Sequence, residues 1–139
     1  MPGDCVSLVV LFGWSFAAAT VLPLSSEVPL IVVVKASGTW VVPVLVATAG
    51  NFIGACTTFA LARAAVGVAP PPSERVRRAS ALLARHGPPT MLLSWVPVIG
   101  DVLVGLAGAS RMPFWRFGIW TAIGKCARYV AIAIAVDRL

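Results

Sequence analysis

Four ionisable residues stand in apolar stretches of this chain, where a charge is costly unless it has a partner. Glu27 and Asp101 each follow a proline by four residues, and Lys125 and Arg128 lie three residues apart in the last apolar segment. Residues three apart are neighbours on one helical face. Ionisable groups in hydrocarbon face a partner or water and often mark ion or substrate routes. These types indicate carboxylates that could take up protons and cations that could attract a phosphate.

The composition predicts the medium in which these residues work. Of all residues 59% are hydrophobic and only 12% are charged, and the mean hydropathy is +0.93. Such values are far from those of a soluble domain. The net charge of +6 favours anionic lipid surfaces over nucleic acid, because no run of lysine and arginine alternates with exposed aromatic residues. We therefore expect one small integral membrane domain over residues 1–139.

Breaker residues precede both carboxylates and predict broken helices. Pro97 removes a backbone donor and clashes with the preceding turn, and Gly100 lets the chain bend before Asp101. Pro23 interrupts the apolar run before Glu27 in the same way, and Ser25 or Ser26 could cap the helix that follows. Each stretch thus reads as two half-helices that meet at a polar apex. The start of the second half-helix favours a negative charge.

Two longer apolar segments are predicted to cross the membrane, at residues 40–66 and 118–136. The first carries Gly50-Asn51-Phe52-Ile53-Gly54, a G-x-x-x-G pattern that permits close helix packing. Asn51 is either a hydrogen-bonding residue of this packing face or a binding residue. Lys125 and Arg128 are either mid-depth cations with a buried partner or anchors at the interface.

The two halves of the sequence repeat at a constant offset of 74 residues. This offset relates Pro23 to Pro97, Glu27 to Asp101, and Gly50 to Gly124. If each broken stretch is re-entrant, each repeat crosses the membrane once, so the second enters from the opposite side. The two apices of such inverted repeats usually meet at the bilayer midplane and form a site. We expect repeat one over about residues 5–66 and repeat two over about 89–136.

The linker over residues 67–88 has a different character. Ser73 and Glu74 follow three prolines and predict a helix start, and the basic stretch that follows has apolar residues at helical spacing. This pattern predicts a short basic amphipathic helix on the membrane surface, or a solvated linker helix. The excess of arginine places the linker in the cytoplasm.

Metal chemistry is not indicated by the cysteines and the histidine. Cys5, Cys56 and Cys126 lie among apolar or small residues, their spacing matches no zinc pattern, and His86 is the one histidine. We expect buried thiols, no metal and no cofactor. An intramembrane enzyme such as a lipid phosphatase would need a nucleophile with a base, or a metal cluster, and we therefore expect no enzyme.

Four ordered motifs, which span about residues 11–133, resemble the YqaA-like branch of the DedA family, bacterial inner-membrane proteins of the VTT (SNARE-associated) superfamily. They are Leu22-Pro23-x-Ser25-Ser26-Glu27, Gly50-Asn51-x-x-Gly54, Trp95-x-Pro97-x-x-Gly100-Asp101 and Gly124-Lys125-x-x-Arg128-Tyr129. The resemblance implies paired re-entrant loops, a multi-pass place in the inner membrane and, from better-studied branches, transbilayer movement of lipids coupled to an ion gradient. The main branch has two arginines around its second apex. Their positions fall here on Ser94 and Gly100.

The fold that we expect is an all-α integral membrane protein with two inverted-topology repeats. Each repeat has a re-entrant helical hairpin and a transmembrane helix, and the amphipathic helix joins them. We expect a flippase- or scramblase-like transporter of phosphate-bearing lipids, such as polyprenyl phosphate or phospholipid. Lys125, Arg128, Asn51 and Trp95 would bind the substrate, and the two apical carboxylates would couple protons.

The alternative is a non-transporting scaffold or assembly factor for envelope maintenance, in which the same charges are structural ion pairs. The small size also predicts a homo-oligomer, with the glycine-spaced faces as candidate contacts.

Overall fold

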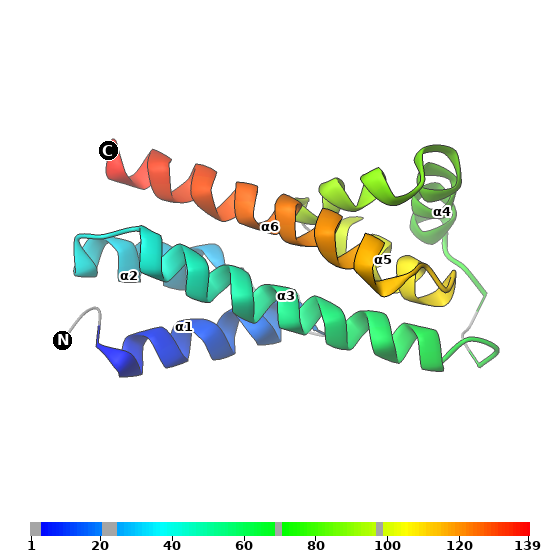
Figure 1. The fold of residues 1–139 in the computed structure, drawn as a ribbon, viewed down its shortest axis with the longest axis horizontal. Coiled ribbons are helices and arrows are strands. Elements are labelled where there is room, and N and C mark those ends of the chain that lie inside the picture. Colours follow the sequence, from blue (N-terminus) through cyan, green and yellow to red (C-terminus); the bar gives the residue numbers. More distant parts are fainter. Residues whose placement is uncertain (1–3, 21–24, 69–70, 97–98) are drawn as a thin grey trace. The chain divides into compact units, whose positions relative to one another are not determined.

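The computed structural model describes residues 4–20, 25–68, 71–96 and 99–139, and these residues form seven helices and no strand. The order along the chain is α1 (Cys5–Ala18), α2 (Glu27–Ser37), α3 (Val41–Ala64), α4 (Glu74–His86), the 3-10 helix η1 (Pro88–Trp95), α5 (Ile99–Ala109) and α6 (Phe114–Asp137) (Figure 1). The all-helical class expected from the composition is confirmed.

Two of these helices, α3 and α6, are long and apolar enough to cross a membrane, and each has 24 residues. At about 1.5 Å per residue such a helix rises about 36 Å, more than the roughly 30 Å of bilayer hydrocarbon. Both spans are predicted by the sequence. Helix α6 begins at Phe114, four residues before the expected start at Gly118, because the aromatic residues expected at the interface continue the helix.

The other apolar helices are too short to cross alone. Helix α1 has 14 residues and helices α2 and α5 have 11 each. Their rise of about 16–21 Å is well below the hydrocarbon thickness. Helix α2 is capped by Gly38, whose φ of 67° is the left-handed conformation that glycine adopts most easily. Lys35 lies in the last turn of this helix.

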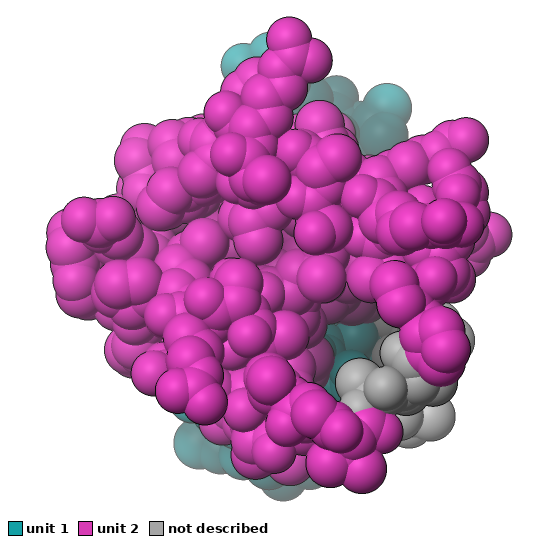
Figure 2. Space-filling model, turned by 90° about the vertical axis from the view of Figure 1, so that its right-hand side faces the viewer, with its two compact units in different colours: residues 1–54, 125–139 teal, residues 55–124 magenta. Residues whose placement is uncertain are grey.

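The chain folds into two compact units, coloured separately in Figure 2. Unit 1 comprises Met1–Gly54 and Lys125–Leu139, and unit 2 comprises Ala55–Gly124. Each long helix therefore contributes one part to each unit.

Unit 1 is held together by an apolar cluster to which α1, α2, α3 and α6 all contribute. Its buried members are Leu11, Leu30, Val33, Val34, Val44, Ala47, Tyr129 and Ala133. Helix α1 also packs closely on α3, because a Cβ on Gly50 would lie 2.5 Å from the Phe12 carbonyl oxygen and one on Gly54 would lie 2.5 Å from that of Phe16. The close packing predicted from the G-x-x-x-G pattern is confirmed. Helix α1 of the same chain occupies this glycine face.

Unit 2 has its own core around three phenyl rings. The rings of Phe59 and Phe117 stack with centroids 4.3 Å apart, and Phe114 meets Phe59 edge-on at 5.9 Å. Helix α5 lies tightly against α3, because a Cβ on Gly108 would come within 2.2 Å of the Phe59 carbonyl oxygen. Stacked aromatic residues and close backbone packing thus define this core.

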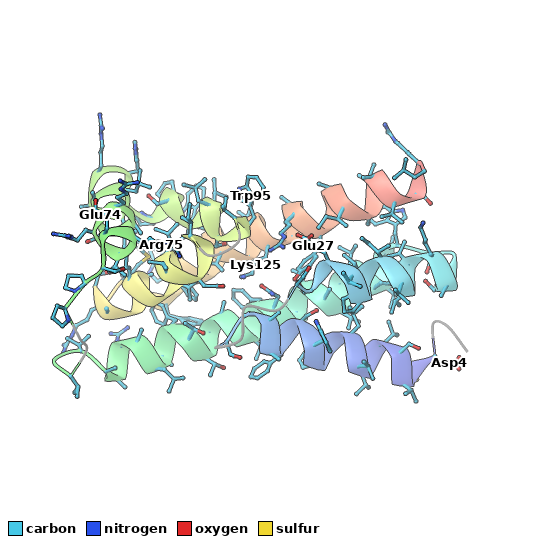
Figure 3. All side chains as sticks on the ribbon, turned by 180° about the vertical axis from the view of Figure 1, so that it is seen from behind. Asp4, Glu27, Glu74, Arg75, Trp95 and Lys125 are labelled. Atoms are coloured by element: carbon cyan, nitrogen blue, oxygen red, sulfur yellow. The ribbon has the colours of Figure 1, made fainter. Side chains whose placement is uncertain are left out.

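Helix α4 belongs to unit 2 and begins as the sequence predicts, with the Ser73 hydroxyl accepting a bond of 3.4 Å from the Val76 amide. Ala79 on its apolar side is buried within the unit 2 core. Glu74 and Arg75 point outward (Figure 3). Packing within the protein therefore takes up the centre of the apolar side, and the arginine side remains exposed.

The stretches around Pro23 and Pro97, which were predicted to be broken helices, are described only in part. Pro23 and Pro97 lie outside the described residues. Before the second apex the chain forms the 3-10 helix η1 rather than an α-type half-helix, and Pro88 and Pro89 are its first two residues. Gly100 is required here, since a Cβ would lie 2.3 Å from the Ser94 carbonyl oxygen. Helix α5 begins at Ile99, so Asp101 lies in its first turn.

The buried positions of α3 and α6 coincide at the offset of 74 residues found in the sequence. The residues involved are Pro43, Val44, Ala47, Gly50, Asn51, Ala55 and Phe59 in α3, and Phe117, Gly118, Thr121, Gly124, Lys125, Tyr129 and Ala133 in α6. Gly54 is the one further buried residue of α3, and its equivalent Arg128 is half-buried. The two helices thus use the same packing face, as a duplicated sequence predicts.

Candidate functional site

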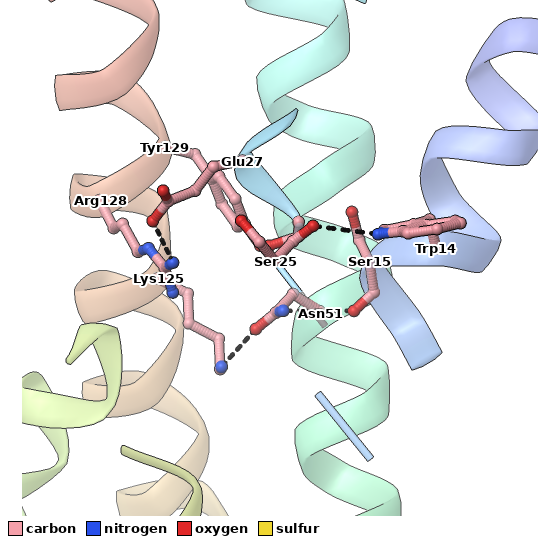
Figure 4. A network of polar contacts seen from close by, with 9 residues as sticks. Trp14, Ser15, Ser25, Glu27, Asn51, Lys125, Arg128 and Tyr129 are labelled. Carbon is pink, nitrogen blue, oxygen red and sulfur yellow. Dashed lines mark hydrogen bonds and ion pairs between the residues drawn. The ribbon is translucent and has the colours of Figure 1, made fainter. Parts of the chain in front are cut away.

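The candidate site lies in unit 1, where α1, α2, α3 and α6 bring polar side chains together (Figure 4). Its first part is a partly exposed ion pair between the Arg128 guanidinium of α6 and the Glu27 carboxylate of α2. The Arg128 side chain is 17% exposed and the Glu27 side chain 41%. Glu27 is the first residue of α2, where the helix dipole favours its negative charge. An anion that approaches from outside could therefore compete for Arg128.

The second part is the Lys125 ammonium, which is buried with only 4% of the residue exposed. It donates to the Asn51 side-chain carbonyl oxygen, and Asn51 in turn donates through Nδ2 to the Ser15 carbonyl oxygen at 3.2 Å. Asn51 thus links the lysine to α1, because its side-chain oxygen and its side-chain nitrogen both form hydrogen bonds. Lys125 and Asn51 are equivalent positions at the 74-residue offset, so α3 and α6 contact each other there through matching positions.

The third part is a pair of buried hydroxyl groups. The Ser26 Oγ and the Tyr129 hydroxyl oxygen lie 2.5 Å apart, and either group can be the donor. The indole nitrogen of Trp14 donates to the Ser25 carbonyl oxygen at 3.0 Å and ties the same segment to α1. Ser26 occupies the N-cap position of α2, as expected, but its hydroxyl makes no cap hydrogen bond, because it contacts Tyr129 instead.

Lys125 and Asn51 both lie near the middle of their long helices. Lys125 is the twelfth of 24 residues in α6, and Asn51 is the eleventh of 24 in α3. In helices that cross a bilayer these positions are near the midplane, where an unpaired charge is most costly. The contacts of Lys125 and Arg128 show why both cations are accommodated there. Each of them has a protein partner, Asn51 for Lys125 and Glu27 for Arg128.

The predicted site residues divide between the two units. Glu27, Asn51, Lys125 and Arg128 come together in unit 1. The other predicted residues that the structure describes, Trp95, Gly100 and Asp101, belong to unit 2. Trp95 is 48% exposed at the end of η1, and Gly100 is buried against the Ser94 backbone. Figure 3 labels Glu27 of α2 and Lys125 of α6, which belong to unit 1, and Trp95 of η1, which belongs to unit 2.

Sequence reasoning missed the hydroxyl pair and the tryptophan contact. Tyr129 and Ser26 are 103 residues apart, and Trp14 and Ser25 belong to segments on either side of the first proline. Both hydroxyl residues appear in the motifs that carry the family resemblance, directly beside Arg128 and Glu27. Their position next to the predicted ion-pair residues was the signal in the sequence that could have indicated this contact. Among the described residues, no group of three metal-ligating side chains comes together.

The chain is similar to one protein family and to several named proteins. The model of the VTT domain matches residues 22–138. The chain is 40% identical over 134 residues to the inner membrane protein YqaA of Escherichia coli, with 95% of this chain and 92% of that protein covered, and the protein of that name in Shigella flexneri matches equally. An uncharacterized protein of Haemophilus influenzae is 35% identical, with 91% of this chain and 85% of that protein covered.

No solved structure matches the chain significantly. The relatives cover nearly the whole sequence, and the family model includes every residue of the site that lies in α2, α3 and α6. The chain therefore belongs to the VTT-domain (DedA) family of inner-membrane proteins.

Proposed function

We propose that this protein is a flippase- or scramblase-like lipid transporter that moves phosphate-bearing lipids, such as polyprenyl phosphate or phospholipids, across the inner membrane with proton coupling. The observation that carries the proposal is the pairing of Arg128 with Glu27 beside the buried Lys125, halfway along a candidate membrane span. Cations at such a depth attract the anionic headgroup, which is the part of a lipid that crosses hydrocarbon least easily.

The proposed cycle uses the Glu27–Arg128 ion pair as the point of exchange. A proton that binds the Glu27 carboxylate removes its charge, and a phosphate oxygen then replaces it as the acceptor for the Arg128 guanidinium. The buried Lys125 adds a second positive charge. Loss of the proton restores the carboxylate, which competes with the phosphate for Arg128 and releases it. Asp101 is the second proposed proton acceptor, at the apex of the other repeat.

The proposed architecture is a pair of inverted repeats, each with a re-entrant hairpin and one crossing. The short lengths of α1, α2 and α5 support hairpins that return to their own side, and the matching buried positions of α3 and α6 support duplication. Inverted repeats can present one site alternately to the two sides of a membrane. Trp95 would contact the lipid from the second hairpin, since its indole is half exposed.

Reconstitution in liposomes tests this function. The purified protein is placed in vesicles that carry a fluorescent phospholipid or a polyprenyl phosphate, and the loss of headgroup from the outer leaflet is followed after a pH step. Substituting Glu27→Gln and Asp101→Asn together should slow translocation at least about tenfold, equivalent to about 1.4 kcal/mol. Lys35→Ala, which removes an exposed cation at the end of α2, is the matched control. An unchanged rate in the double variant would remove the mechanism.

A scaffold function remains the second candidate, favoured by one specific observation. Both cations of the site already have protein partners, as structural ion pairs and buried polar contacts require. Exchanging the partners through Glu27→Arg with Arg128→Glu separates the two functions. A scaffold should regain function, because the ion pair is rebuilt. A transporter should remain folded and abundant but inactive, because the arginine has moved from α6 to the tip of α2.

A further inference from the structure

The start of α2 is attached to α6 by two contacts between consecutive residues. Ser26 contacts Tyr129 through hydroxyl oxygens 2.5 Å apart, and Glu27 pairs with Arg128. The Arg128 guanidinium also lies 5.9 Å from the centroid of the Tyr129 ring, within the range of a cation–π contact. The two attachments are therefore adjacent, and a change in one directly affects the surroundings of the other.

The two attachments respond differently to a proton. The ion pair depends on the charge of Glu27, and its partly exposed side chains can exchange partners. The hydroxyl pair is uncharged, and Tyr129 and Ser26 are only 1% and 2% exposed. Breaking it would leave two buried hydroxyl groups without a hydrogen-bond partner or water, which is unfavourable. Protonation of Glu27 therefore weakens one attachment and leaves the other in place.

The equivalent positions in unit 2 are buried without hydroxyl groups. At the 74-residue offset Ser26 corresponds to Gly100 and Tyr129 corresponds to Ala55, and all four residues are buried. Unit 2 thus fills these positions with the two smallest residues. The hydroxyl pair thus lies in unit 1, next to the Glu27–Arg128 ion pair, and the equivalent positions in unit 2 carry no hydroxyl group.

We propose that Tyr129 is a positioning residue whose bond to Ser26 keeps the start of α2 docked on α6 while the Glu27–Arg128 ion pair is open. Glu27 then remains beside Arg128 and can recapture it when the phosphate leaves. The role of the docking in transport rests on the proposed function. The docking of α2 on α6 itself can be measured without transport.

Hydrogen exchange in lipid nanodiscs tests the docking. The amides of Ile31–Val34, which bond to the first carbonyl groups of α2, report whether its first turn is held. Glu27→Gln mimics the protonated carboxylate and should leave these amides protected. Adding Tyr129→Phe, which keeps the ring and removes only the hydroxyl, should speed their exchange roughly five- to tenfold, as the loss of one buried hydrogen bond implies. Ser37→Ala in the Glu27→Gln background is the control, because it removes a hydroxyl at the other end of α2.

Two results would overturn the inference. One is fast exchange in Glu27→Gln alone, which would show that the hydroxyl pair does not hold α2. The other is full protection in the double variant, which would show that the hydroxyl pair is dispensable. Transport then separates the purpose from the docking. Tyr129→Phe should lower the maximal translocation rate and leave the lipid concentration for half-maximal rate unchanged. The double variant Ser26→Ala with Tyr129→Phe should be no slower than Tyr129→Phe alone, because both substitutions remove the same hydrogen bond. If the exchange results hold and the wild type moves no lipid, the proposed function fails and the docking stands.

Discussion

Unit 1 and unit 2 are built on equivalent positions, but their polar residues differ. Unit 1 holds Lys125, Arg128, Glu27 and the Ser26–Tyr129 hydroxyl pair among its helices. Unit 2 has stacked phenyl rings in its core and carries seven of the eleven cationic residues of the chain, all arginine and all exposed. The buried positions of α3 and α6 thus match at the 74-residue offset, whereas the buried cations lie in one unit only.

The largest expected effect concerns the contact between Asn51 of α3 and Lys125 of α6, which are equivalent at the 74-residue offset. Asn51→Lys would put a second ammonium beside Lys125, and an uncompensated buried charge costs about 3–5 kcal/mol of folding free energy. The exchange Asn51→Lys with Lys125→Asn restores one ammonium and one amide. Its unfolding free energy in detergent should therefore lie closer to that of the wild type than that of either single variant. An exchange variant as unstable as Asn51→Lys would show that the two equivalent positions are not interchangeable.

A smaller effect is expected where the two apices differ. Gly100→Ser gives unit 2 the residue that unit 1 has at Ser26, but its Cβ would lie 2.3 Å from the Ser94 carbonyl oxygen. We expect a loss of about 1–3 kcal/mol, as in other overpacked sites. Gly105→Ser in the same helix is the control, since nothing lies within 4 Å of its Cβ position. Thermal unfolding in detergent should separate the two variants, and equal melting temperatures would contradict the close approach.

The smallest effect is expected when two carboxylates that pair with arginine are compared, Glu27 in unit 1 and Glu74 in unit 2. Glu74 contacts Arg77 at 3.1 Å and Arg78 at 3.3 Å on the exposed side of α4, where such pairs contribute at most about 1 kcal/mol. Glu27 pairs with a more buried arginine. Glu27→Gln should therefore lower the unfolding free energy by about 1 kcal/mol, and Glu74→Gln by less than about 0.5 kcal/mol. The same order should persist in 0.5 M salt, which screens the exposed pairs more strongly. A larger loss for Glu74→Gln would reverse the comparison.

Much of the fold is predictable because local patterns determine it. The two spans follow from apolar length, the start of α4 follows from Ser73 and Glu74, and the packing of α1 on α3 is consistent with the spacing of Gly50 and Gly54. The 3-10 form of η1 was not predicted, because a proline pair can begin either type of helix.

The site is predictable only in part. The cost of a buried charge predicted that Lys125 and Arg128 have partners, and Glu27 was among the expected ones. The sequence left open whether Asn51 packs or binds, and its contacts with Ser15 and Lys125 show that it at least links three helices. The bond between Tyr129 and Ser26 was not predicted, because it joins residues far apart in sequence whose side chains are ordinary in either helix.

The measurement that tests the central claim most directly is mass spectrometry of the lipid that co-purifies with the protein. The account predicts that the wild type retains a phosphate-bearing lipid and that Lys125→Ala with Arg128→Ala loses it. Lys35→Ala with Arg138→Ala, which removes two exposed cations from helix ends, should retain it. Equal retention by both double variants, or a wild type that carries only lipids without phosphate, would contradict the account.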